Sequence, residues 1–302
     1  MKIKNLFIVV LCLLLASCGN KSGKNKVSID SIIDESKQES GLEISAESLN
    51  SIIESIPSPL EIAMVIMQSG SGFNDKMLND LGNAKQYSTD QEKAFNIGIY
   101  SGDLGYINMY EKAYLTVNTL TTIKDLADDI NVGQFFDFAT IKRMASQSDK
   151  MDSLIYISTN TFNKMDAFLR SQKRSNLSIL MVTGTWTEGL YIATQVIKET
   201  NNKELVEWVG YQKVIIDQLI LGLSAYKRDP YFEGLMADLA SLKTVYDKIS
   251  ITYDYHEPES VEVDGRLVIV DKSTSTVNIT PEQVKEISDL VTQIRQKLVK
   301  NS

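Results

Sequence analysis

The chain has 302 residues, of which 43% are hydrophobic and 23% are charged, and this is the composition of an ordinary globular protein. Its formal net charge is −8, so it lacks the basic surface that nucleic acid requires, and nucleic acid is excluded as a partner. The single histidine excludes a histidine-rich metal site, and no metal or cofactor is predicted.

The first eighteen residues predict an export signal. Lys2 and Lys4 precede the apolar run 6–15, which is shorter than the roughly 20 residues that a membrane-spanning helix needs. The run ends in Leu15-Ala16-Ser17-Cys18, which resembles the lipobox of bacterial lipoproteins. The resemblance implies that residues 1–17 are a signal peptide, that the sulfur of Cys18 carries diacylglycerol, and that its amine carries an acyl chain such as palmitate.

The residues after Cys18 indicate where the lipoprotein is held. By the same resemblance, an aspartate next to the cysteine favours the inner membrane, but Gly19 stands there, and residues 20–24 carry no acidic signal for surface export. We therefore expect the periplasmic face of the outer membrane, with the cell surface as the alternative. Residues 18–28 are polar and predict a flexible tether. Since Cys12 leaves with the signal peptide, the mature domain has no free thiol.

Residues 29–302 are predicted to form one helical domain, because apolar residues recur at helical spacing and several segments begin with helix-capping signals. The stretch 90–130 is either one helix or two helices joined near Asn108. The predicted helices span 29–39, 45–56, 59–68, 73–81, 90–130, 134–146, 149–173, 176–199, 204–227, 230–249 and 281–298.

The pattern changes to β near the C-terminus. Residues 251–255 are β-branched and aromatic, and Asp264-Gly265 separates two alternating runs, which predicts a hairpin with a two-residue type I′ turn. A lone hairpin is marginal in water, so it must dock on the helices or gain a strand, for which 276–279 is the candidate. The predicted fold is mainly α: antiparallel helical hairpins, as a bundle or an α-solenoid, with a small β-hairpin insertion at about 251–279.

Two glycine-rich helical stretches are the candidate ligand-binding site. Asp103 and Glu188 lie within otherwise apolar stretches, where a buried carboxylate needs a partner. We expect them to line a pocket between helices, or else the glycines to mark tight helix packing. Residues 97–101 can also be aligned with 183–187, which suggests a duplication. The aromatic residues that would complete the pocket are Tyr100, Tyr106, Trp186 and Tyr191.

Two functions remain open. The first is a non-catalytic binding or scaffold module that serves an envelope protein partner or a small ligand, and is held at the membrane through Cys18. The second is an envelope glycan hydrolase that uses Asp103 and Glu188. No catalytic motif is present and no catalytic residue is predicted, so we favour the first. The mature region resembles the many uncharacterised helical lipoproteins of Gram-negative envelopes, and this resemblance implies no activity.

Overall fold

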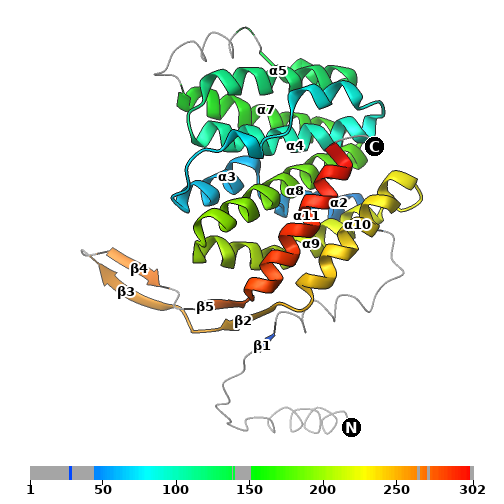
Figure 1. The fold of residues 1–302 in the computed structure, drawn as a ribbon. Helices are drawn as coiled ribbons and strands as arrows, with labels where there is room; N and C mark the ends of the chain where they lie inside the picture. The colour runs from blue at the N-terminus through cyan, green and yellow to red at the C-terminus, as the bar shows by residue number, and fades with distance from the viewer. Residues whose placement is uncertain are drawn as a thin grey trace, which may run out of the picture.

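The structure is a computed structural model that describes residues 27–28, 44–137, 139, 151–263, 266–270 and 273–299. Within these residues the fold is mainly α, as predicted, with short strands near the C-terminus (Figure 1). The signal peptide, Cys18, the predicted helix 29–39 and most of the predicted helix 134–146 lie outside the described residues.

Capping signals in the sequence mark several helix starts. The Ser58 hydroxyl accepts the N–H of Glu61, whose carboxylate accepts the N–H of Ser58, and Thr89 and Glu92 form the same reciprocal pair. The helices are α2 (Ala46–Ser55), α3 (Pro59–Gln68), α4 (Asp90–Met109), α5 (Ala113–Asp129), α7 (Met151–Ser171), α8 (Ser175–Thr200), α9 (Lys203–Ser224), α10 (Pro230–Tyr246) and α11 (Pro281–Val299).

Two expectations about the helices are resolved or corrected. The stretch 90–130 is two helices, α4 and α5, and it breaks at residues 110–112. The prediction of a helix over 73–81 is wrong, because the chain forms only short 3-10 turns there, η1 (Asp75–Met77) and η2 (Leu81–Gln86). Side chains of α4 and α11 form hydrogen bonds to backbone groups of this segment.

Helix α8 lies at the centre of the bundle. Its side chains are buried almost continuously from Leu177 to Ile197, and it packs against α2, α3, α4, α7, α9 and α11. A helix that is buried on all sides belongs to the interior of a globular core. The arrangement is therefore a bundle, since a solenoid helix would contact only its neighbours along the stack.

Helices α2 and α3 cover one side of this core. The stretch Ala46–Gln68 that contains them is apolar enough, by length and composition, to cross a membrane. It is broken at residues 56–58, however, and both helices bury one face against the core, through Leu49 and Ile53 on α2 and through Ile62 and Ile66 on α3. A core-facing helical pair accounts for its hydropathy.

The β region forms two separate sheets. Strand β2 (Ser250–Asp254) pairs antiparallel with β1 (Val27–Ser28), the last two residues of the predicted tether, and with β5 (Thr274–Asn278). Strands β3 (Glu259–Val263) and β4 (Arg266–Val270) form the predicted hairpin, and the pairing of Val263 with Arg266 leaves a two-residue loop. Strand β5, expected as a further strand for the hairpin, pairs with β2 instead.

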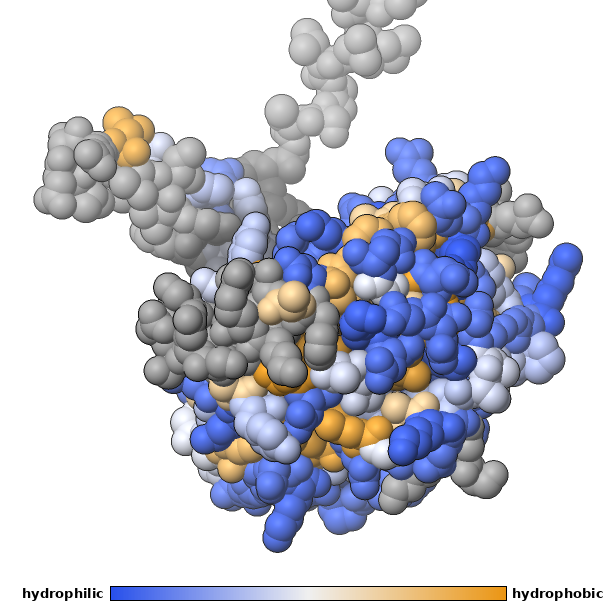
Figure 2. All heavy atoms as spheres, turned by 90° about the horizontal axis from the view of Figure 1, so that it is seen from above, coloured by the Kyte–Doolittle hydropathy of each residue, from blue (hydrophilic) through white to orange (hydrophobic). Residues whose placement is uncertain are grey.

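The surface is largely hydrophilic at the end of the molecule formed by α5 and α7. Seen from above, this face is covered mostly by hydrophilic residues, with apolar residues in small areas between them (Figure 2). Small, scattered apolar areas are normal on a protein surface in water.

Candidate functional site

Glycines bring α4 and α8 into close contact. A Cβ atom at Gly184 would lie 2.0 Å from the carbonyl oxygen of Phe95, and one at Gly98 would lie 2.0 Å from the carbonyl oxygen of Met181. No side chain fits in these positions, because the obstacle is the backbone of the other helix. Close helix approach therefore accounts for the glycines that the sequence places inside two good helices.

The contact between α4 and α8 is reciprocal. Gly98 faces Met181 and Thr185, which lie three residues before and one residue after Gly184, and Gly184 faces Phe95 and Ile99, which lie three before and one after Gly98. One turn farther on, Gly102 faces Glu188, so the two helices run in the same direction. The segments 97–101 and 183–187, which can be aligned in the sequence, thus meet each other across a pseudo-twofold crossing.

Glu188 is fully buried and forms a two-point ion pair with Arg295 of α11. The Arg295 Nε lies 2.5 Å from Oε2 and the Nη2 lies 2.6 Å from Oε1 of Glu188. Glu188 is 0% exposed and Arg295 is 7% exposed. A buried carboxylate needs such a partner, because removing an unpaired charge from water is costly.

Two further groups hold the Arg295 guanidinium in place. Its Nη2 donates to the carbonyl oxygen of Met77 at 3.1 Å, and its central carbon lies 4.2 Å from the centre of the Tyr191 ring. A cation over an aromatic face is attracted by the ring, and more strongly where water is excluded. Arg295 therefore joins α8, α11 and the segment that precedes α4.

Asp103 brings a second carboxylate to the same cluster. It is 1% exposed, its Oδ2 accepts the backbone N–H of Asn79 at 3.0 Å, and its Oδ1 has no hydrogen-bond partner. Burial, followed by the charge of Glu188, raises the pKa of Asp103 well above its ordinary value, although Arg295 acts in the opposite direction. The raised pKa favours the neutral, protonated form of Asp103 beside the ion pair of Glu188 and Arg295.

This protonation predicts an unusual pH dependence. In the folded state Asp103 retains a proton that the unfolded chain loses above pH 3.8, the ordinary pKa of aspartate. The contribution of Asp103 to stability therefore falls as the pH rises from 3.8 through the raised pKa of the folded state. Asp103→Asn cannot lose a proton, and it keeps nearly the same size and shape. We expect its melting temperature, relative to the native chain, to rise between pH 4 and pH 8 in thermal scans followed by circular dichroism.

Asp125→Asn, at an exposed position on α5, is the control for the loss of one carboxylate. A difference between Asp103→Asn and the native chain that stayed constant with pH, or that grew toward acid, would show that Asp103 is ionised in the folded protein.

The other two predicted site residues on α4, Tyr106 and Tyr100, form hydrogen bonds to backbone groups. The Tyr106 hydroxyl accepts the N–H of Asn74 at 3.0 Å and donates to the carbonyl oxygen of Gly72 at 3.3 Å, and the Tyr100 hydroxyl donates to the carbonyl oxygen of Asp80 at 2.9 Å. Burial raises the pKa of Tyr106 to about 12, so its phenol remains a donor at neutral pH.

Tyr100, Asp103 and Tyr106 thus lie three residues apart on α4 and all contact the segment 72–80. The sixth predicted residue, Trp186, is buried away from them and donates its indole N–H to the side-chain oxygen of Gln212 at 2.9 Å. Of the predicted set, the structure brings Asp103, Glu188 and Tyr191 together around Arg295.

Sequence reasoning missed Arg295, Asn79 and Tyr87. The Tyr87 hydroxyl accepts from the Asn79 side chain at 3.4 Å and donates to the carbonyl oxygen of Val299 at 3.0 Å, which satisfies the end of α11. One signal could have identified Arg295: it continues the buried stripe of α11 formed by Val284, Ser288 and Val291 at helical spacing. A charged residue in such a buried stripe needs a buried partner of opposite charge.

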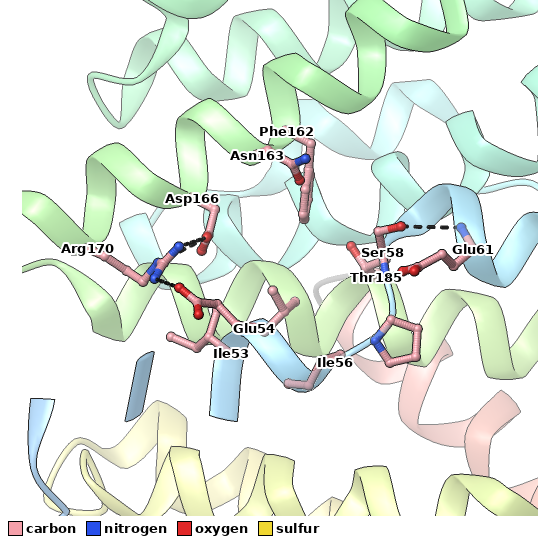
Figure 3. Close-up of a pocket in the computed structure, with 12 residues that line it drawn as sticks. Ile53, Glu54, Ile56, Ser58, Glu61, Phe162, Asn163, Asp166, Arg170 and Thr185 are labelled. Carbon is pink, nitrogen blue, oxygen red and sulfur yellow. Dashed lines mark hydrogen bonds and ion pairs between the residues drawn. The ribbon is translucent and has the colours of Figure 1, made fainter. Parts of the chain in front are cut away.

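An open cavity of about 260 Å³ lies elsewhere, between α7 and the junction of α2 and α3. Figure 3 shows Arg170 on one side of it, pairing with Asp166 of its own helix and with Glu54 of α2, where the Arg170 Nη1 lies 2.6 Å from the Glu54 Oε1. The Ser178 hydroxyl also bonds to Asp166. Neither Asp103 nor Glu188 lines this cavity.

Among the described residues, no group of three or more His, Cys, Asp or Glu side chains is placed to hold a metal ion. His256 is exposed, and its Nε2 lies 3.8 Å from a carboxylate oxygen of Asp254. The chain matches no protein-family model, no curated protein and no solved structure.

Proposed function

We propose that the chain is a lipid-anchored protein of the bacterial envelope, held at the periplasmic face of the outer membrane, whose helical domain is a non-catalytic binding or scaffold module. The observation that carries the proposal is the sequence Leu15-Ala16-Ser17-Cys18 at the end of a short apolar run. Several acyl chains on one cysteine give stable attachment, whereas one chain alone binds only marginally.

The state of the two buried carboxyl groups supports a non-catalytic role. A glycoside hydrolase needs both carboxyl groups to flank the sugar bond, and a general acid or base has to reach the proton it transfers. Glu188 and Asp103 are 0% and 1% exposed, and Glu188 has both oxygens on Arg295. A small ligand of the module would instead find room in the open cavity beside α7.

Replacement of Cys18 tests the anchor. In a Gram-negative host fed a clickable palmitate analogue, we expect Cys18→Ala to abolish labelling and to leave the protein unprocessed, because the acylated sulfur is gone. The native chain should be labelled and should sediment with the outer membrane. The measurement is in-gel detection of the analogue together with membrane fractionation.

Cys12→Ala is the matched control, since Cys12 is the only other cysteine and lies in the segment that is removed. It should be labelled like the native chain. Equal labelling of Cys18→Ala would refute the anchor. Release of soluble fragments from purified peptidoglycan by the native protein, abolished by Glu188→Gln, would refute the non-catalytic role.

A further inference from the structure

Strand β1 places the β region close to the proposed lipid anchor. Strand β1 (Val27–Ser28) pairs with β2, and Cys18 precedes Val27 by nine residues. Because an extended chain gains at most about 3.6 Å per residue, Cys18 lies within roughly 30 Å of β2. A bilayer that holds the acyl chains of Cys18 is therefore always close to this sheet.

The hairpin β3–β4 lies at the same end of the molecule. It follows β2 after residues 255–258 and forms a two-stranded sheet of its own. Figure 1 shows it projecting from the helical body at the end that carries β1, away from α5 and α7. Strand β5, in contrast, packs on α9, where Val277 fills the space beside Gly210. A two-stranded hairpin alone is marginally stable in water, so this one needs a contact with another surface to stabilise it.

The exposed side chains of this region suit a membrane interface. Leu267 of β4 is 79% exposed, and Tyr255 is 61% exposed. The rings of Tyr255 and Tyr253 lie 6.4 Å apart. Tyrosine is enriched at the level of lipid headgroups, where its ring meets the acyl chains and its hydroxyl meets water.

We propose that the hairpin β3–β4 and Tyr255 rest on the bilayer that holds the lipid of Cys18, with Leu267 entering the boundary between headgroups and acyl chains. The inference rests on the proposed anchor. The contact orients the domain so that the hydrophilic end formed by α5 and α7 faces away from the membrane (Figures 1 and 2).

The charge of the hairpin indicates which lipid headgroup the contact favours. Residues 257–270 contain four acidic residues, Glu257, Glu259, Glu262 and Asp264, and one basic residue, Arg266, so an anionic surface repels this segment. The contact is therefore apolar, with a zwitterionic bilayer. The short stretch between Cys18 and β1 supplies the high local concentration that such a weak contact needs.

A thiol at position 267 tests the contact in the full-length, lipidated protein. With Cys12 removed and Cys18 acylated, Leu267→Cys carries the only free thiol of the mature chain, to which an environment-sensitive fluorophore is attached. Tyr114→Cys is the matched control, because Tyr114 is 78% exposed on α5, at the opposite end. Both proteins are reconstituted into phosphatidylcholine vesicles with or without a doxyl-labelled quencher in the acyl chains.

We expect the label at 267 to shift its emission to the blue and to be quenched about twofold or more, because interfacial groups lie within quenching distance of the acyl chains. The label at 114 should show neither effect, and added phosphatidylglycerol should weaken the effect at 267. Vesicle-bound protein in which both labels behave alike would overturn the inference and leave the anchor intact.

Shielding at 267 that depends on protein concentration and not on the lipid quencher would mean that a second copy or a partner strand covers the hairpin, which also overturns the inference. Protein that fails to float with the vesicles would overturn the anchor and the inference together.

Discussion

Gly184→Ala is expected to lower the free energy of unfolding by about 3 kcal/mol, at the upper end of the cost of overpacking a core. The new methyl carbon would lie 2.0 Å from the carbonyl oxygen of Phe95 and 3.2 Å from the nitrogen of Ile99. These are backbone atoms of α4, so neither can rotate away, and the two central helices have to separate. Urea denaturation followed by tryptophan fluorescence and circular dichroism measures the change.

Gly234→Ala is the matched control for this substitution. Gly234 also lies inside a helix, α10, but a Cβ atom there would meet nothing within 4 Å. Alanine should therefore stabilise the protein by about 0.5–1 kcal/mol, as helix propensity predicts. The same chemical change thus has opposite signs at the two positions. If both substitutions stabilised the protein, the close contact of α4 and α8 would be refuted.

The reciprocal geometry of the crossing adds a second test. Gly98→Ala should cost as much as Gly184→Ala, because its methyl carbon meets the carbonyl oxygen of Met181 at the same 2.0 Å. Either substitution forces the same two helices apart. The double variant should therefore lose clearly less stability than the sum of the single losses, which is the mark of coupled sites.

Local signals in the sequence were sufficient for most of the fold. The caps at Ser58 and Thr89 mark the starts of α3 and α4, and the two-residue loop fixes the pairing of Val263 with Arg266. Each signal acts over a few residues, so it can be recognised in one stretch of chain. The glycines were also informative, because a glycine inside a good helix requires an explanation and close packing supplies it here.

The segment 73–81 shows where local reasoning fails. Its apolar spacing suggests a helix, but its backbone polar groups bond to distant side chains: the N–H of Asn79 to Asp103, and the carbonyl oxygen of Met77 to Arg295. These tertiary hydrogen bonds replace the helical ones. They join residues far apart in the chain, so no short pattern reveals them.

The candidate site was predictable only in part for the same reason. The sequence indicates that Asp103 and Glu188 are buried and need a partner, but Arg295 lies 107 residues beyond Glu188, on a helix that follows the β region. Helical periodicity can mark Arg295 as a buried charge, but its pairing with Glu188 is set by the packing of α11 against α8, which no local pattern reveals.

Arg295→Met is expected to destabilise the protein by about 3–5 kcal/mol, the cost of leaving one member of a buried ion pair without its partner. Glu188 would be fully buried with no cation, and the carbonyl oxygen of Met77 would lose its donor. Chemical denaturation measures the change.

Lys297→Met, on the same helix, is the matched control. Lys297 pairs with Asp238 at 2.7 Å, but its side chain is 57% exposed, so water screens the pair and its loss should cost no more than about 1 kcal/mol. Methionine is a good helix former, so neither variant should disturb α11 itself. The contrast between the two therefore isolates the effect of burial.

A second substitution decides whether the cluster serves stability or function. In the double variant Arg295→Met with Glu188→Leu, no charge remains without a partner, and Asp103 can stay protonated in apolar surroundings. Because a buried ion pair can often be replaced by apolar residues at little cost, most of the lost stability should return. A double variant that folds normally but loses a binding activity of the native protein would contradict the structural role, and would identify Asp103, Glu188 and Arg295 as a ligand site that opens during binding.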